Sequence, residues 1–332
     1  MPVHAHVRRC RISRASVKSG RFEAFPSVVV LTQNRIDENM LAEEKLREGD
    51  VSGAVAALKR EVQQDPANGK YRVFLFQLLS VQSKWESAAT QLEVAGDLDP
   101  GNLAMVQAYR EAIRCESERQ SVFDGKSAPM IFGEPDRWVA LLLQSLKLLA
   151  DGQPAKAASL RKEAFELAPG TSGTVTLGNN DSSAFEWIAD ADSRIGPVME
   201  VFMNGQYYWV PLQRIARMQF EAPADLRDFV WTAAHFTWAN GGEAVGMIPT
   251  RYPGISPQDD PLVQLSRKTQ WGQIGDTTID YGVGQRMLVT DSAEYGLLDV
   301  RELELDTEAE SESETTSVEQ RHGEGTSTED FA

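Results

Sequence analysis

Two Asp-Pro pairs lie 34 residues apart in the first half of the chain, at Asp65-Pro66 and Asp99-Pro100. The apolar spacing of Ala54 to Leu58 recurs with the same shift at Ala88 to Leu92. A 34-residue period is typical of tetratricopeptide repeats, in which each period is a pair of helices. Each Asp-Pro marks a helix end, because proline cannot donate to a helix interior and disfavours the helical region for the residue before it.

Apolar residues within each period recur at helical spacing. The first stripe is Val51, Ala54, Val55, Leu58 and Val62, and the second is Trp85, Ala88, Ala89 and Leu92. Such stripes are the buried faces of amphipathic helices. The pattern resumes after a loop at Gly125–Pro135 and ends at Ala168-Pro169, which predicts about seven helices between Glu38 and Ala168. Residues 37–170 are therefore predicted to be a tetratricopeptide-like helical domain, whose apolar end needs a cap.

In the second half of the chain, apolar residues alternate with other residues, as they do in β-strands. Asn204-Gly205 separates two such runs and predicts a two-residue hairpin, and Asn240-Gly241-Gly242 predicts another. The predicted strands are 185–188, 199–203, 206–210, 215–220, 236–238, 244–248, 287–289 and 297–300, with 170–181 as a linker or first edge strand. Intervals this short leave no room for helical crossovers, so residues 171–300 are expected to form a mostly antiparallel β domain, with a short helix at Leu226–Trp231. The fold class is α+β.

The two ends of the chain differ in charge. Residues 1–36 carry seven Arg or Lys against one Glu, and residues 301–332 carry eleven acids against two Arg. Both are expected to be disordered; residues 1–36 are alternatively a mistaken translational start or a segment that binds something acidic. The middle of the chain is acidic, which disfavours nucleic acid as a partner. With no apolar run of membrane length and only Cys10 and Cys115, a reducing cytoplasm fits.

Motifs for chemistry are sparse, and no cofactor is expected. The chain lacks a phosphate loop, a Gly-x-Ser-x-Gly elbow and a paired-histidine zinc motif. The best carboxylate set is Glu186, Asp190 and Asp192, with Asp228, Asp276 and Asp280 elsewhere, and Asp190 and Asp192 could hold a hard cation such as Mg²⁺. Alternatively, residues 190–194 form a turn in which the aspartates bond their own backbone and Arg194 neutralises one of them. Gly282–Arg286 lacks the further glycine of a dinucleotide site and is expected to be a bend or bulge.

Several of these segments together resemble one family. They are FEWIADADSRIGP at 185–197, YWVP at 208–211, LRDFVW at 226–231, IPTRYP at 248–253 and GVGQR at 282–286. In order and spacing they resemble the ImpE family, also called SciE-type or TagJ proteins, over roughly Asp37 to Val300. The resemblance implies an accessory protein of the bacterial type VI secretion system that binds the N-terminal helix of the small contractile-sheath subunit and is linked to the ClpV ATPase. It brings no catalytic residues.

Two functional hypotheses follow. The first is a non-enzymatic cytoplasmic adaptor that binds a helix of the small sheath subunit, ClpV or both, without nucleic acid or membrane. Because Trp, Tyr and Arg dominate interface energetics, the expected contributors to partner binding are Tyr207, Trp209, Arg227, Trp231, Arg251 and Tyr252. The alternative is a metal-dependent hydrolase using Asp190, Asp192 and Asp228, which requires these three carboxyl groups to converge within a few ångströms.

Overall fold

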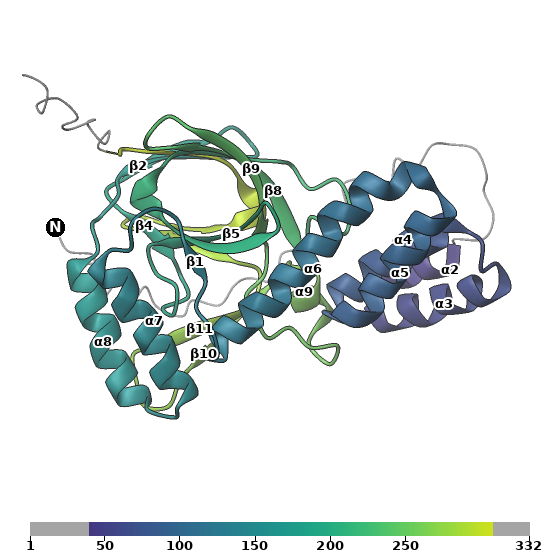
Figure 1. The fold of residues 1–332 in the computed structure, drawn as a ribbon, viewed down its shortest axis with the longest axis horizontal. Helices are drawn as coiled ribbons and strands as arrows, with labels where there is room; N and C mark the ends of the chain where they lie inside the picture. The colour runs from purple at the N-terminus through teal and green to yellow at the C-terminus, as the bar shows by residue number, and fades with distance from the viewer. Residues whose placement is uncertain (1–39, 308–332) are drawn as a thin grey trace, which may run out of the picture.

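The computed structural model describes residues 40–307, in which an elongated helical array stands beside a strongly curled sheet (Figure 1). The array consists of α2 (Met40–Arg47), α3 (Val51–Gln64), α4 (Gly69–Val81), α5 (Trp85–Leu98) and α6 (Leu103–Phe123). Among the helices between residues 40 and 307, none is both long and apolar enough to cross a membrane. The predicted α+β fold, with paired helices before a mostly antiparallel sheet, is confirmed.

The two Asp-Pro pairs end helices as predicted. Asp65 is the C-cap of α3 and Asp99 is the C-cap of α5, both with backbone angles outside the helical region. The stripe residues Ala54, Leu58, Ala88 and Leu92 are buried, because they face the neighbouring helices of the array. The 34-residue period is therefore a structural repeat: α3 and α5 begin 34 residues apart, and so do α4 and α6.

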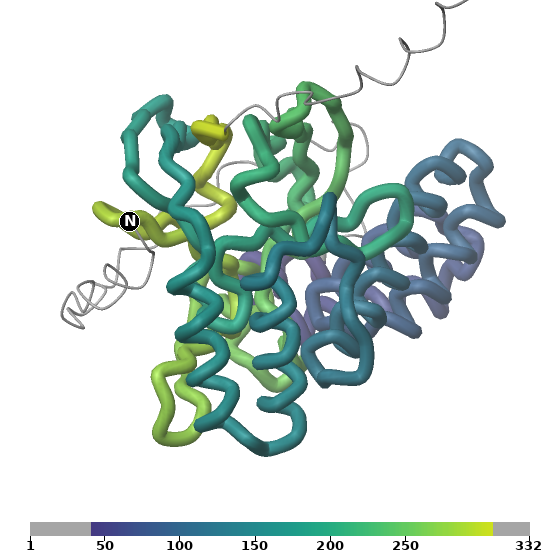
Figure 2. The backbone as a smooth tube through the Cα atoms, turned by 60° about the vertical axis from the view of Figure 1, so that its left-hand side comes forward, coloured from purple at the N-terminus to yellow at the C-terminus, as the bar shows by residue number. Residues whose placement is uncertain are grey.

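The two helices that follow α6 do not continue this stack. After α6 the chain passes through a two-residue strand, β1 (Met130–Ile131), which pairs with the sheet. Only then do α7 (Arg137–Ala150) and α8 (Pro154–Leu167) form a hairpin, which lies apart from α2–α5 in both views (Figures 1 and 2). The helical region predicted over 37–170 is thus divided after α6, because β1 carries the chain along the sheet before α7 begins.

Nine strands form the main sheet, in the order β1-β6-β5-β9-β8-β7-β14-β2-β3. Its pairs are antiparallel except for β1 with β6. The strands after β1 are β2 (Gly173–Leu177), β3 (Ser182–Phe185), β5 (Val198–Met203), β6 (Gln206–Pro211), β7 (Ile215–Phe220), β8 (Trp231–Trp238), β9 (Glu243–Pro249) and β14 (Val300–Leu305). The sheet curls around a core of its own that includes Val201, Met218 and Phe236 (Figure 1).

Two smaller sheets complete the chain. One is β13-β12-β4, formed by β4 (Ile188–Asp190), β12 (Met287–Thr290) and β13 (Glu294–Gly296). The other is the hairpin of β10 (Thr269–Gln273) and β11 (Asp280–Gly284), which the sequence did not predict. The short helix is α9 (Pro261–Gln264), capped by the Asp260 side chain.

The prediction of a helix at Leu226–Trp231 is wrong. Residues 226–230 form turns, and Trp231 already belongs to β8. The cause is local: the Asp228 carboxylate accepts hydrogen bonds from the backbone N–H groups of Ala224 and Asp225, and Asp225 accepts from Arg227 N. Aspartate side chains that bind nearby backbone groups favour turns over helix.

Both predicted hairpins are present. Asn204 and Gly205 have φ of 51° and 68°, the left-handed pair that a type I′ turn requires, and Met203 pairs with Gln206 across it. The prediction of a disordered tail from residue 301 is wrong for 301–305, which lie in β14 with Leu303 and Leu305 buried. The predictions for residues 1–36 and for the tail from 308 onward lie outside the described residues.

Candidate functional site at the seam between the repeat and the sheet

Helix α6 joins the two architectures. It is 21 residues long; its first half belongs to the repeat, and its last turns lie against the sheet (Figure 1). We use the term seam for the region where the repeat meets the sheet. It comprises the contact of α6 with the sheet, the α4–α5 turn, and the residues around Arg251 and Arg286. One apolar core crosses it, because Phe202, Trp209 and Trp231 of the sheet pack with the residues of the repeat.

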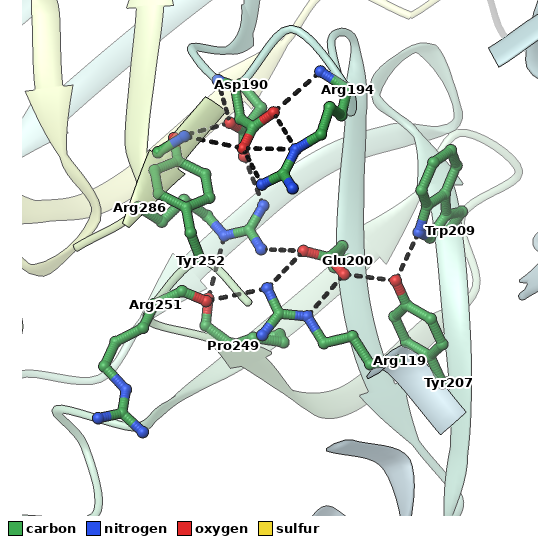
Figure 3. A network of polar contacts seen from close by, with 12 residues as sticks. Arg119, Asp190, Arg194, Glu200, Tyr207, Trp209, Pro249, Arg251, Tyr252 and Arg286 are labelled. Carbon is green, nitrogen blue, oxygen red and sulfur yellow. Dashed lines mark hydrogen bonds and ion pairs between the residues drawn. The ribbon is translucent and has the colours of Figure 1, made fainter. Parts of the chain in front are cut away.

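A chain of buried charges forms the centre of the seam (Figure 3). Arg119 of α6 donates two hydrogen bonds of 2.8 Å to the two oxygens of Glu200 in β5. Glu200 also accepts from Arg286, whose other terminal nitrogen donates to Asp190. Arg119, Glu200 and Arg286 are at most 2% exposed and Asp190 is 4% exposed, so these charges depend on one another for compensation.

The two carboxyl groups of this chain have opposite pKa shifts. Burial alone would raise the pKa of Glu200, but the charges of Arg119 and Arg286 lower it to about 2. Burial raises the pKa of Asp190 to about 7, with the charge of Arg286 acting in the other direction. Glu200 is held between two guanidinium groups, whereas Asp190 has one and lies near the Asp192 carboxylate, which raises its pKa further.

Polar contacts fix the strand side of this network. Tyr207 donates to Glu200 and accepts from Trp209 Nε1 at 2.6 Å, so a tyrosine and a tryptophan of β6 are positioned by the same carboxylate. Tyr252 donates to Asp190 Oδ1 at 2.8 Å. The ring of Tyr252 lies under Gly282, where an added Cβ would come within 2.2 Å of it. Glycine at 282 is therefore required by this packing.

An aromatic group forms the other half of the seam. The Trp231 ring centroid lies 5.7 Å from that of Trp85 and 5.6 Å from that of Tyr109, so β8 contacts both α5 and α6. Trp231 Nε1 donates to Glu116 of α6 at 3.0 Å, and the Arg227 guanidinium lies 4.9 Å from the Tyr109 ring centroid. These rings supply apolar contact that the neighbouring ion pairs do not.

Arg251 binds the repeat to the sheet without a carboxylate. Its guanidinium donates to the backbone oxygens of Ser80, Val81 and Gln264, and to the Ser83 hydroxyl at 3.3 Å. Burial lowers the pKa of Arg251 to about 10, although Glu116 acts in the other direction. The C-terminal end of α4 is thereby tied to Arg251, two residues after the end of β9.

The six residues predicted to bind a partner all lie in or beside the seam, but five of them are buried. Tyr207, Trp209, Trp231, Arg251 and Tyr252 are at most 3% exposed, and their polar atoms bond within the chain. Only Arg227 keeps a partly exposed side chain, at 23%. Because the structure contains the chain alone, their role in partner binding stays a prediction.

The three aspartates of the hydrolase hypothesis do not converge on an ion. Asp190 binds Arg286, Asp192 binds Arg194 and the backbone N–H of Gly282, and Asp228 binds the turn at Ala224. Between residues 40 and 307 no group of three or more His, Cys, Asp or Glu side chains could hold a metal ion. The hydrolase hypothesis is therefore wrong for these residues.

The alternative interpretation of residues 190–194 as a turn is confirmed. Asp192 N donates to Asp190 Oδ1, and both the backbone and side chain of Arg194 donate to Asp192. Of the segment Gly282–Arg286, which was expected to be a bend or bulge, residues 282–284 are instead the end of β11, and Gly284 ends that strand with φ of 106°.

The central residues of the seam were missed by the sequence analysis. Arg119 and Glu200 are 81 residues apart, and Glu200 and Arg286 are 86 apart, so no local pattern links them. One signal was available: Glu200 stands in the run Val198–Met203, in which every other residue is apolar and every residue is buried. A charged residue in such a strand indicates a buried partner of opposite charge.

Comparisons with known proteins agree with this architecture. The family model described as "ImpE protein" matches residues 182–304. A Pseudomonas aeruginosa protein described as "Type VI secretion system accessory component TagJ" is 45% identical over 267 residues, which are 80% of this chain and 91% of that protein. The crystal structure of a Vibrio parahaemolyticus protein has a TM-score of 0.72 at 22% identity, covering 80% of this chain and 98% of that chain, and shows the fold alone.

Proposed function

The chain belongs to the ImpE family, and from this membership we propose that it is an accessory component of a bacterial type VI secretion system that acts as a non-enzymatic adaptor between proteins. The observation that carries the proposal is the 45% identity to the Pseudomonas TagJ protein over 267 residues. Neither the helical part nor the sheet part is that long. The similarity therefore crosses the seam and includes both parts.

The adaptor's partner is the N-terminal helix of the small contractile-sheath subunit, the ClpV ATPase, or both. A helical repeat offers grooves into which an amphipathic helix can lay its apolar face. Here the repeat is fixed to the sheet by the Arg119–Glu200 ion pair and by the rings around Trp231, so both parts present one preformed surface. Preformed surfaces bind with a smaller loss of conformational entropy.

The six predicted residues have different roles under this proposal. Arg227, whose side chain is partly exposed, contacts the partner directly. The five buried residues hold the elements of the seam in place, as Trp231 does between α5 and α6, and they act on the partner only through that geometry. The chain works in the cytoplasm, where a sheath subunit and an ATPase that recycles sheath are both accessible.

Binding to the sheath peptide tests the adaptor proposal. The full chain is titrated with a peptide spanning the N-terminal helix of the small sheath subunit, followed by isothermal calorimetry, with a scrambled peptide of the same composition as control. We expect saturable binding of the native peptide with a Kd below about 100 μM, which corresponds to roughly 5 to 6 kcal/mol.

A second titration uses purified ClpV in place of the peptide. Binding to either protein at this level supports the adaptor, and binding to both identifies a bridge between them. Absence of binding to both, at concentrations where the chain is folded by circular dichroism, contradicts the proposal.

A further inference from the structure

A cleft of about 440 Å³ opens at the seam. Its walls are the α4–α5 turn, the outward face of the second half of α6, and residues Arg251–Ile255. Hydroxyl and amide groups of Ser83, Ser117 and Gln120 line it, together with the half-buried ring of Trp85. A concave surface that combines a few polar groups with aromatic area is typical of ligand sites.

The charges that line this cleft are not all compensated. Glu116 accepts from Arg119 and from Trp231, and Asp124 accepts from Lys126 and Gln120, so both carboxylates are already engaged. Arg251 differs. Within residues 40–307 no carboxylate lies within ion-pair distance of its guanidinium, which is bonded to three carbonyl oxygens and one hydroxyl.

A buried cation without a counter-ion is electrostatically unfavourable. Arg251 is 3% exposed; its two terminal nitrogens are hydrogen-bonded to neutral oxygens, and Glu116 acts on its charge only from beyond ion-pair distance. An anion that enters the cleft lies next to this charge in a region of low dielectric, where the attraction is stronger than in water. Burial in this low-dielectric region also lowers the pKa of Arg251.

Ser83 connects this charge to the cleft. Its hydroxyl accepts from Arg251 and lines the cleft, so the hydroxyl proton is free to be donated to an incoming acceptor. Ser83 also has φ of 53°, a left-handed conformation in which glycine is the least strained residue. A serine held there keeps its hydroxyl between Arg251 and the cleft.

We propose that this cleft binds a carboxylate side chain of a partner protein, with Arg251 supplying the attracting charge, Ser83 donating a hydrogen bond, and Trp85 contacting an apolar neighbour of that carboxylate. The inference rests on the proposed adaptor function, since it specifies the chemistry of the segment that docks. A polyanion such as nucleic acid is repelled by the net charge of −16, whereas a single carboxylate needs one uncompensated cation.

A pair of small peptides tests the cleft directly. The full chain, isotopically labelled, is titrated with acetyl-Leu-Glu-Leu-amide and separately with acetyl-Leu-Gln-Leu-amide, and backbone amide shifts are followed by NMR. We expect the Glu peptide to shift the amides of Ser83, Ser117 and Gln120 and to bind at least about 10-fold more tightly than the Gln peptide. Equal shifts from both peptides, or none at these residues up to roughly 20 mM, overturn the proposal.

Variants separate the cleft from non-specific binding. Ser117 is exposed on α6, so Ser117→Glu places a carboxylate in the cleft without disturbing the buried network. We expect it to weaken the Glu peptide at least about 10-fold. Ser159→Glu on the exposed face of α8 makes the same change away from the cleft and should leave binding unchanged. Equal effects of the two variants would also overturn the proposal.

The sheath peptide distinguishes failure of this inference from failure of the adaptor function. If the sheath peptide binds but the Glu and Gln tripeptides behave alike, the cleft proposal is wrong and the adaptor stands. If the Glu tripeptide binds selectively and neither sheath peptide nor ClpV binds, the cleft proposal stands and the assigned partners are wrong.

Discussion

The two helical regions have similar sequence patterns, yet they are attached to the sheet by different chemistry. Helices α2–α6 are tied to it through buried ions, with Arg119 bonded to Glu200 and to the backbone oxygen of Arg251. Within residues 40–307, helices α7 and α8 are attached without a fully buried ion pair, since the pair of Arg214 with Asp136 at the start of α7 is partly exposed. Phe165 of α8 packs against the backbone at Gly196, and Arg161 donates to the backbone and hydroxyl oxygens of Thr278.

This difference determines how precisely each helical region is positioned relative to the sheet. An ion pair between buried groups has a narrow geometry, and removing one partner leaves a charge that nothing compensates. A contact between an aromatic ring and a glycine does not require one exact geometry. When it is altered, the protein loses stability in proportion to the change in packing. The buried ion pairs therefore fix the orientation of the repeat relative to the sheet. The α7–α8 hairpin is held mainly by the packing of its side chains.

Removing the central carboxylate gives the largest expected effect. Glu200→Gln leaves Arg119 and Arg286 without full compensation, and we expect a loss of about 3 to 5 kcal/mol in the free energy of unfolding. Urea denaturation followed by tryptophan fluorescence measures it. A loss below about 1 kcal/mol would show that the ionic attachment is no stronger than an exposed one.

Lowering the pH should remove the stabilisation that the Glu200 carboxylate gives to the native chain. The folded pKa of Glu200, about 2, is lower than its ordinary value of 4.5, so the folded state binds the proton less tightly than the unfolded state. The stabilisation is complete above pH 4.5 and is lost as the pH falls toward 2. We expect the stability difference between the native chain and Glu200→Gln to be about 2 kcal/mol smaller at pH 3 than at pH 7. A difference that does not change over this range would contradict the assignment.

The apolar attachment is tested by Gly196→Ala. A Cβ at this position comes within 2.5 Å of the Phe165 ring, and φ is 66°. We expect a loss of about 2 kcal/mol, with faster hydrogen exchange in α8 than in α5. Gly152→Ala is the matched control, because Gly152 has φ of 70° and open space around it, and should cost only about 1 kcal/mol of backbone strain. Equal losses in the two variants would exclude the packing contribution.

The smallest effect is expected from the polar contact of the same hairpin. Arg161→Met removes hydrogen bonds of 2.8 and 3.0 Å to Thr278 but retains apolar contact with Phe165. Within the described residues the charge of Asp280 acts on Arg161 without forming an ion pair with it, so little charge imbalance is left behind, and we expect a loss of about 1 kcal/mol or less. A loss as large as that of Glu200→Gln would remove the distinction between the two attachments.

Local features of this fold could be predicted from the sequence because they depend on neighbouring residues. The helix ends at Asp65 and Asp99 and the hairpin at Asn204-Gly205 follow from backbone conformations that these residues impose themselves. The helix predicted at Leu226 failed for an equally local reason, since Asp225 and Asp228 bond the turn instead. An apolar pattern indicates which residues are buried but does not exclude such competing contacts.

The seam could not be predicted in the same way. Its aromatic residues were recognised as contributors to partner binding, whereas Trp209 and Trp231 are buried within the chain beside α6. Its ion pairs join residues 81 and 86 positions apart, and the sequence gives no sign of which charges meet. The family resemblance indicated that these segments belong together, but it did not indicate that Arg119 compensates Glu200.

The separation of these partners along the chain has a consequence for synthesis. Arg251 closes on the Val81 carbonyl across 170 residues, and at about 5 to 20 residues per second a ribosome needs on the order of ten seconds or more to make that interval. Within that interval Arg119 has no partner for the 81 residues until Glu200 is made, and the apolar face of the repeat that packs on the sheet is open. We expect the nascent chain to be most vulnerable to aggregation in this interval, which ends when Arg251 reaches the repeat.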